Sequence, residues 1–184
     1  MYLEAYKRWM ETELEDAALT AELQSIEGNE EEIKDRFAVA LSFGTAGLRG
    51  VLGAGTNRMN IYVVRQATQG LANWVKTQGG NQSVAVSYDS RINSDVFAKE
   101  TAKVLAANGI KVYIYKELMP TPMLSYAVRH LKCDAGIVIT ASHNPAKYNG
   151  YKAYGSDGCQ LGPEAAEYVL SIMNTVDRGY QLDE

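Results

Sequence analysis

Cysteine is scarce in this chain of 184 residues, which has only Cys133 and Cys159 and no CxxC spacing. Two isolated thiols argue against a disulfide framework and against a cysteine-based zinc site. Long apolar runs are also missing, since AGIVI at 135–139 is far shorter than the ~20 residues that cross a bilayer. Residues 1–16 are charged throughout and contain no apolar stretch, so no signal peptide is expected. We therefore expect a cytoplasmic protein without a membrane partner.

Positive charge is not in excess either. The chain has 18 lysines and arginines against 22 acidic residues, which gives a net charge of −4. A domain that binds nucleic acid would carry a basic stripe, so no nucleic-acid partner is predicted. The hydrolase motif GxSxG and the GKS/T ending of a P-loop are both absent. Their absence argues against two common classes of enzyme.

The first 40 residues predict helices. Apolar residues at helical spacing indicate one amphipathic helix over 2–24, and Gly28 ends it. The acidic run 30–32 then favours the start of a second helix, because acidic side chains interact well with a helix N-terminus. We expect residues 1–40 to form an N-terminal helical extension.

From residue 41 onward, predicted strands and helices alternate. The strands are predicted at 83–88, 111–115 and 134–140. The helices are predicted at 61–77, from an N-cap at Ser94 to Asn108-Gly109, from an N-cap at Thr121 to about 132, and from Pro163 to about 174. Asn149-Gly150 is a signal for a two-residue hairpin turn. The alternation predicts a three-layer α/β domain over 41–184, with a mixed, largely parallel sheet covered by helices on both faces.

Polar residues follow two of the strands, at the positions where α/β sheets bind ligands. They are Asp-Ser-Arg at 89–91 and Ser-His-Asn at 142–144. Such residues often only satisfy loop backbone groups, which leaves a structural interpretation open. A hydrolase serine is disfavoured. Neighbouring side chains on an extended backbone point to opposite faces, so His143 would face away from Ser142.

A serine that carries a phosphoryl group is the other chemical interpretation. This chemistry needs a hydroxyl nucleophile, cations that balance the transferring charge, and backbone donors around the phosphate oxygens. Ser142 is the candidate nucleophile. Candidate cations are Arg49, Arg91, His143 and Lys152. Glycines 44, 47 and 50 would let backbone N–H groups approach a phosphate closely.

Five segments together resemble the α-D-phosphohexomutase superfamily. They are FGTAGLRG (43–50), TNRMN (56–60), SYDSR (87–91), TASHNP (140–145) and YNGYK (148–152). They occur in the expected order between about Leu41 and Gly162, and TASHNP is highly specific. Within this superfamily, the residues of these segments are most similar to those of the phosphoglucomutase branch, which also includes phosphopentomutases.

This resemblance implies an enzyme that interconverts glucose 1-phosphate and glucose 6-phosphate through a phosphoserine and a bisphosphorylated sugar. The serine of TASHNP is the phosphorylated residue and also holds Mg²⁺, and both roles fall on Ser142 here. The other implied catalytic residues are Arg49, His143 and Lys152. The implied substrate- or phosphate-binding residues are Thr45, Gly47, Arg91, Asn144 and Asn149. For Arg91, a structural ion pair with Asp89 or Asp95 remains an alternative. A sugar bisphosphate is the implied activator.

The resemblance covers only the first of four domains. The metal-binding DGDGD-type loop and the sugar- and phosphate-binding loops belong to domains II–IV, which are absent from the sequence. We therefore expect the other domains of the same polypeptide as partners, a hexose phosphate as substrate, and an isolated chain that is inactive. Three alternatives stay open: a phosphomannomutase, a phosphopentomutase, or a stand-alone, non-catalytic domain that binds sugar phosphates.

Overall fold

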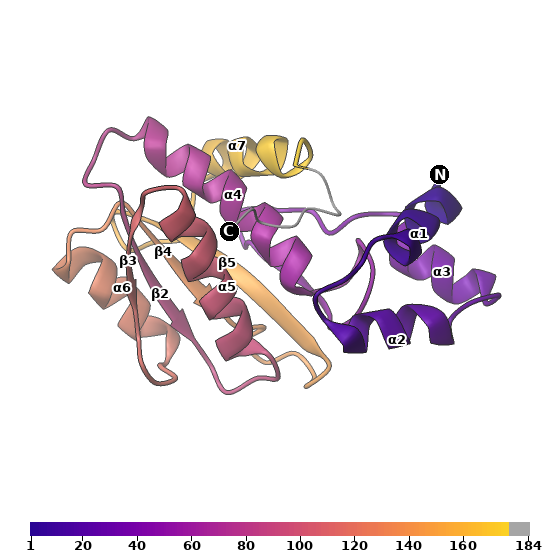
Figure 1. Cartoon of the computed structure of the whole chain (residues 1–184). Coiled ribbons are helices and arrows are strands. Elements are labelled where there is room, and N and C mark those ends of the chain that lie inside the picture. The colour runs from indigo at the N-terminus through magenta and orange to yellow at the C-terminus, as the bar shows by residue number, and fades with distance from the viewer. Residues whose placement is uncertain (177–184) are drawn as a thin grey trace.

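The computed structural model describes residues 1–176 of the chain (Figure 1). The strands are β1 (Leu48–Val51), β2 (Ser83–Tyr88), β3 (Lys111–Ile114), β4 (Ala135–Ile139) and β5 (Tyr148–Gly155). The helices are α1 (Tyr2–Glu11), α2 (Ala17–Ser25), α3 (Glu30–Phe37), α4 (Ile61–Thr77), α5 (Ser94–Ala107), α6 (Thr121–His130) and α7 (Pro163–Met173). The end of the predicted domain, from 177 on, lies outside the described residues.

The strands form one mixed sheet with the order β1-β5-β4-β2-β3. Strand β2 is parallel to β3 and β4, whereas β5 is antiparallel to both β4 and β1. Within the described residues β5 is therefore the one reversed strand, and the other four strands run in the same direction. The prediction of a mixed, largely parallel sheet is confirmed.

Helices cover both faces of this sheet, as predicted. Val84 and Ile137 point into the larger part of the core, which they share with residues of α4, α5 and α7. Ala85 and Val138 point the other way and pack against Leu124 and its neighbours in α6. Successive residues of β2 and β4 thus pack against helices on opposite faces of the sheet, because side chains alternate along a strand.

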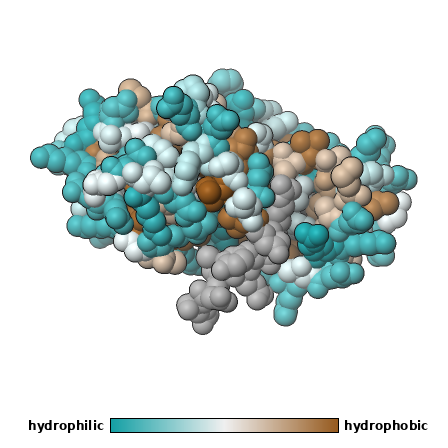
Figure 2. Space-filling model, turned by 90° about the horizontal axis from the view of Figure 1, so that it is seen from above, coloured by the Kyte–Doolittle hydropathy of each residue, from teal (hydrophilic) through white to brown (hydrophobic). Residues whose placement is uncertain are grey.

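Helix α4 packs against α5 and α7, and most of its residues are buried. The two helices approach closely at Gly70, where an added Cβ would lie 2.6 Å from the backbone oxygen of Val169. Figure 2 looks onto the side of the molecule that carries α4 and α7. Most of that surface is hydrophilic, with hydrophobic residues among the polar ones, as is usual for a protein surface.

The N-terminal extension holds two helices over the range where one was predicted. Helix α1 ends where Thr12 adopts an extended backbone, and α2 begins after Asp16, whose carboxylate caps its first turn. The break lets Glu15 accept two hydrogen bonds, of 2.6 and 2.7 Å, from Arg65 of α4. These hydrogen bonds lower the pKa of the Glu15 carboxyl. The prediction of one helix over 2–24 was wrong, because periodicity does not register this contact with a distant helix.

Helices α1 and α2 pack against α4 and share its core. The rings of Trp9 and Tyr62 meet edge to face with centroids 5.5 Å apart, and the Tyr62 hydroxyl accepts a hydrogen bond from the Glu15 N–H at 2.8 Å. Leu23 of α2 belongs to the same cluster of buried residues. Figure 1 shows α1, α2 and α3 together at one end of the molecule, beyond the sheet.

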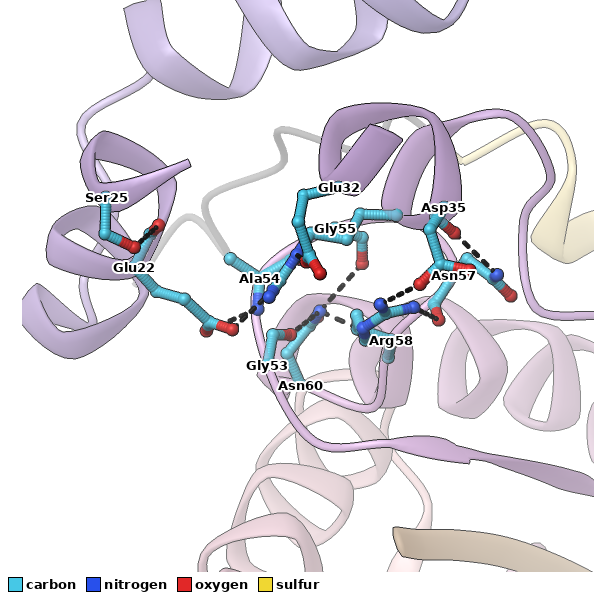
Figure 3. Close-up of polar contacts among 11 residues, drawn as sticks. Glu22, Ser25, Glu32, Asp35, Gly53, Ala54, Gly55, Asn57, Arg58 and Asn60 are labelled. Carbon is cyan, nitrogen blue, oxygen red and sulfur yellow. Dashed lines mark hydrogen bonds and ion pairs between the residues drawn. The ribbon is translucent and has the colours of Figure 1, made fainter. Parts of the chain in front are cut away.

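The loop between β1 and α4 is held by polar contacts, which Figure 3 shows. The amide of Asn60 donates to the carbonyls of Gly53 and Gly55 at 2.9 and 3.0 Å, and its oxygen caps the first turn of α4. Arg58 forms an ion pair with Asp35 of α3. The TNRMN segment therefore has a structural role: it starts α4 and joins that helix to the N-terminal extension.

A hairpin turn at Asn149-Gly150 was predicted, and this prediction was wrong. Both residues lie inside β5, where Gly150 pairs with Arg49 of β1. An added Cβ at Gly150 would lie 2.7 Å from the Thr140 oxygen and 2.8 Å from the Leu48 oxygen. The glycine therefore allows neighbouring backbones to approach closely and does not form a turn.

The remaining predicted elements agree with the structure, apart from two helix starts, whereas strand β1 was not predicted. Ser94 is the first residue of α5 and not its N-cap, which is Asn93 with a left-handed backbone. Thr121 is likewise the first residue of α6, after Pro120. The helix over 61–77 and the predicted strands are confirmed, with shifts of one residue at three strand ends. In residues 1–176 there is no helix with the length and hydropathy that crossing a membrane requires.

Candidate active site

The candidate residues gather at the edge of the sheet where β2 and β4 end. Residues 89–91 follow β2, and the loop 140–147 joins β4 to β5. Tyr151 of β5 pairs with Ile139, the last residue of β4, and with Leu48, the first residue of β1. Strand β1 therefore begins at the level where β4 ends, and its residues lie beside the loop 140–147.

Ser142 is exposed and has a left-handed backbone, with φ of 57°. This conformation costs a non-glycine residue on the order of 1–3 kcal/mol, so neighbouring contacts have to hold it. The Thr140 hydroxyl accepts a hydrogen bond from the Ser142 N–H at 3.0 Å, and the Asn144 N–H donates to the Ala141 carbonyl at 3.1 Å. The resulting turn presents the Ser142 hydroxyl to solvent.

The side chains of Ser142 and His143 lie close together, which corrects the prediction that they face apart. Ser142 Oγ is 3.3 Å from His143 Nδ1. The prediction assumed an extended backbone, whereas the left-handed conformation at Ser142 brings the two side chains to one side. At this distance the imidazole can donate a hydrogen bond to the hydroxyl oxygen or accept one from it.

Arg49 and Lys152 lie on the same face of the sheet. Lys152 is directly opposite Val138 of β4, and Arg49 is opposite Gly150, two residues before Lys152. Because side chains alternate along a strand, both cations point to the face that α6 covers farther along the sheet. Arg49 Nη1 also donates to Asn144 Oδ1 at 3.0 Å, which joins β1 to the loop of Ser142.

Thr45 and Gly47 lie in a tight turn over 44–47. The Gly44 N–H donates to the Gly47 carbonyl at 3.1 Å, and the Gly47 N–H donates to the Gly44 carbonyl at 2.7 Å. These two amides are engaged within the turn, and Gly50 is paired inside β1. The prediction that these glycines let backbone N–H groups approach a phosphate closely stays a prediction. Thr45 is exposed at the tip of the turn.

Gly47 fits directly against β5. Its φ is 79°, and an added Cβ would lie 1.9 Å from the Tyr151 oxygen and 2.9 Å from the Lys152 Cα. The Tyr151 side chain is fully buried below the site and receives a hydrogen bond of 3.2 Å from the Thr68 hydroxyl. Burial raises the pKa of Tyr151, so its hydroxyl stays neutral. The side chain of Tyr151 thus packs β5, the strand that carries Lys152, against the core.

Arg91 and Asn149 contact protein groups. The Arg91 guanidinium donates to backbone carbonyls of the Ser142 loop and lies 3.5 Å from Asp89 Oδ2, whereas Asp95 pairs with Lys99. The Asn149 side chain is fully buried and donates to Ser94 Oγ at 3.0 Å and to the Ile92 carbonyl at 2.9 Å. The structural ion pair expected as an alternative for Arg91 is therefore present, with Asp89. Asn149 has no exposed atoms for a substrate.

A surface hollow of ≈ 440 Å³ opens beside Ser142. It is lined by Asp89, Ser90, Arg91, Ile92, Ser142, Asn144 and Ala146. The residues after β2 and those after β4 thus form one site, as their positions at the ends of neighbouring strands predicted.

The described residues do not fit a magnesium site by themselves. Residues 1–176 contain no group of three or more His, Cys, Asp and Glu side chains that could hold a metal ion. The carboxylate nearest to the hollow is that of Asp89, and it is engaged by protein donors: Oδ1 accepts from the Arg91 N–H at 2.9 Å and from Ser94 Oγ at 2.7 Å. Ser142, the predicted metal ligand, supplies a single oxygen, which is fewer than magnesium needs.

Sequence reasoning missed the role of Ser94, which it interpreted as a helix cap. Its hydroxyl links Asp89 to Asn149, and these partners are 5 and 55 residues away in the sequence. No local signal distinguishes such a serine from a cap.

Fold and sequence together define an α/β/α domain of a known enzyme family. Residues 40–179 match the family described as phosphoglucomutase/phosphomannomutase, alpha/beta/alpha domain I, and the chain belongs to this family. The chain is 44% identical over 155 residues to the phosphoglucomutase of Staphylococcus saprophyticus. The matched residues cover 84% of this chain and 28% of that enzyme. The phosphoglucomutase of Staphylococcus haemolyticus is 43% identical over 152 residues. This match covers 80% of this chain and 28% of that enzyme.

A solved structure shows the same fold. The putative phosphomannomutase from Thermus thermophilus superposes with a TM-score of 0.68 at 34% sequence identity, and covers 73% of this chain and 30% of that protein. The chain therefore spans less than a third of the length of these relatives.

Proposed function

We propose that the chain is the first domain of a phosphoglucomutase that interconverts glucose 1-phosphate and glucose 6-phosphate, with Ser142 as the phosphoryl carrier. The observation that carries the proposal is the position of an exposed serine on a left-handed turn at the sheet edge, beside His143 and next to the strands of Arg49 and Lys152. A hydroxyl nucleophile surrounded by cations is the arrangement that phosphoryl transfer requires.

In the first half of the reaction, a free hydroxyl of the hexose phosphate attacks the phosphorus of phosphorylated Ser142. The bond between phosphorus and Ser142 Oγ breaks, a bond to the sugar oxygen forms, and the proton of the sugar hydroxyl ends on Ser142 Oγ. The sugar bisphosphate then reorients. In the second half Ser142 Oγ attacks the other phosphoryl group. The bond between that phosphorus and the sugar oxygen breaks, the serine proton ends on the sugar oxygen, and the isomeric monophosphate leaves while the serine is phosphorylated again.

The surrounding residues have separate roles in this scheme. Arg49 and His143 hold the transferring phosphoryl group, and Lys152 acts near the sugar hydroxyl as acid, base or electrostatic partner. Asn144 orients Arg49 through the hydrogen bond of 3.0 Å between them. Thr45 lies on the turn that packs against the strand of Lys152, and its hydroxyl is the candidate donor to the substrate from this turn.

The rest of the machinery lies outside the chain in this proposal. The relatives are more than three times as long, so the sugar-binding groups come from the remaining domains of the polypeptide. Magnesium would need oxygen ligands from those domains in addition to Ser142 Oγ. A sugar bisphosphate restores the phosphoserine when it is lost. The 184-residue chain alone is then inactive, and the complete enzyme works in the cytoplasm.

A phosphomannomutase is the second candidate. The structural similarity to the putative phosphomannomutase from Thermus thermophilus favours it. The carrier serine and its cations serve both reactions equally, because they act on the phosphoryl group and not on the sugar hydroxyls that differ. A product assay with glucose and mannose phosphates on the complete enzyme separates the two.

The test of the carrier role is Ser142→Ala in the complete enzyme. We expect loss of mutase turnover and loss of phosphate incorporation from labelled glucose 1,6-bisphosphate, because the acceptor hydroxyl is gone. The matched control is Ser90→Ala, an exposed serine that lines the same hollow. Mutase turnover retained by Ser142→Ala would refute the carrier role, and equal losses in both variants would point to damage of the hollow as a whole.

A further inference from the structure

We propose that Arg91 is a positioning residue that holds the loop of Ser142 by hydrogen bonds to its backbone, and that it is not a phosphate ligand. The part of this inference that concerns turnover rests on the proposed function, whereas the part that concerns the conformation of the loop does not.

The hydrogen bonds of the Arg91 guanidinium all end on one short segment. Nη2 donates to the carbonyls of Ser142 at 2.7 Å and Asn144 at 2.6 Å, and Nη1 donates to those of Pro145 and Tyr148 at 3.1 Å each. Four carbonyls between residues 142 and 148 therefore converge on one side chain. One of them is the carbonyl of the left-handed residue itself.

The shape of a guanidinium explains why an arginine stands here. It presents five N–H donors in a fixed plane, and four of them can reach carbonyls on one curved segment at the same time. The fifth donor, on Nε, faces Asp89 Oδ2 at 3.5 Å. A lysine ammonium has three donors around a single nitrogen, so it cannot bridge carbonyls that are spread over seven residues.

Arg91 is itself held in place by Asp89, which buried groups support in turn. Its own N–H donates to Asp89 Oδ1 at 2.9 Å, and the same oxygen accepts from Ser94 Oγ at 2.7 Å. Asn149, fully buried in β5, donates to Ser94 Oγ at 3.0 Å and to the Ile92 carbonyl at 2.9 Å. The loop of Arg91 is therefore fastened to the strand that also carries Lys152.

This network gives Arg91 and Asn149 a common role. Their side chains fix the loop after β2, and through Arg91 they fix the loop after β4, so Ser142 and Lys152 are held relative to one another. The Arg91 donors are occupied by carbonyls, so Arg49, His143 and Lys152 are left as the cations that face the phosphoryl group. Asn149 belongs to this support and not to the substrate contacts that its motif implied.

The first test measures the loop in the 184-residue chain by NMR. A left-handed Ser142 gives a strong intraresidue Overhauser effect between its amide and α protons. In Arg91→Lys and Arg91→Met we expect this signal to weaken equally, and exchange of the Tyr148 amide, which bonds the Pro145 carbonyl, to accelerate by more than about tenfold. Arg129→Lys, on the surface of α6, is the control. Wild-type signals in Arg91→Lys would overturn the proposal.

The unaltered chain offers a second measurement that does not depend on a variant folding. The Nη protons of Arg91 should give separate, slowly rotating signals, because four carbonyls hold them. Those of exposed Arg49, with one hydrogen bond, should average. Averaged signals for Arg91 would contradict the proposal.

Turnover of the complete enzyme then separates positioning from phosphate binding. Misplacement of Ser142 should lower kcat by more than about tenfold in both Arg91→Lys and Arg91→Met, while KM stays within about twofold. A phosphate ligand would instead tolerate lysine, which keeps the charge, and would raise KM in the methionine variant. If the wild-type enzyme showed no mutase activity, the proposed function would fail, and the NMR measurements would still decide the role of Arg91.

Discussion

Replacing Gly47 by alanine gives a sharp test of how the turn at 44–47 supports the site. The new Cβ would lie 1.9 Å from the Tyr151 oxygen and 2.9 Å from the Lys152 Cα. Both are backbone atoms of a paired strand, so no rotamer change relieves the contact. The residue would also keep a φ of 79°, which L side chains rarely adopt.

The size of the effect follows from these two terms. A left-handed backbone costs alanine about 1–2 kcal/mol relative to glycine, and displacing packed backbone costs about 1–3 kcal/mol more. The sum of about 2–5 kcal/mol corresponds to a fall in Tm of about 4–20 °C, at roughly 2–4 °C per kcal/mol for a chain of this size.

Thermal unfolding followed by circular dichroism provides the assay, and Gly44 provides the control. Gly44 lies at the other end of the same turn, and an added Cβ there meets nothing within 4 Å. Gly44→Ala should leave Tm unchanged or raise it slightly, since alanine reduces the entropy of the unfolded chain. If Gly47→Ala unfolded at the same temperature as Gly44→Ala, the turn would not be packed against β5 as described.

Two further predictions concern Lys152 and Glu15. In the complete enzyme, Lys152→Met should lower turnover by about a hundredfold or more while Ser142 can still be phosphorylated. The control is Lys147→Met, in the exposed loop before β5, whose turnover should stay near that of the wild type. Normal turnover of Lys152→Met would remove Lys152 from the mechanism. The pKa of Glu15 is lowered in the folded chain, so its contribution to stability is present above the unfolded value and is lost as the pH falls through the folded value. Glu15→Gln should therefore cost about 1 kcal/mol in urea unfolding near neutral pH, and this cost should shrink as the pH is lowered below the unfolded value. A cost that does not change with pH would show that the carboxylate charge does not contribute.

Local sequence patterns predicted most of the sheet and its helices, because each element carries its own periodicity. The strand at Ser83–Tyr88 and the helix at Ile61–Thr77 were found in this way. The same reasoning failed at Asn149-Gly150, which is a turn signal by composition. There the deciding interaction is pairing with β1, about a hundred residues earlier in the chain, and no local rule contains it.

The sequence predicted where the candidate residues gather, but only part of how they are arranged. The positions after β2 and β4 located the hollow beside Ser142, because strand ends of parallel sheets meet at one edge. The close approach of His143 to Ser142 was missed, because it depends on the left-handed backbone at Ser142, which the sequence Ala-Ser-His does not predict. Arg91 was grouped with the phosphate-binding cations because a sequence shows charge and does not show which carbonyls surround it.

The contact between the N-terminal helices and α4 bears on how this protein can be trimmed. The sequence suggests a domain boundary near residue 40. A chain that started there would lose Trp9 and so expose the ring of Tyr62. It would also lose Glu15, the second carboxylate that pairs with Arg65 besides Glu100. Both changes fall on α4, the helix under the strand of Tyr151. For expression or crystallisation, the first 40 residues are therefore part of the smallest unit worth making.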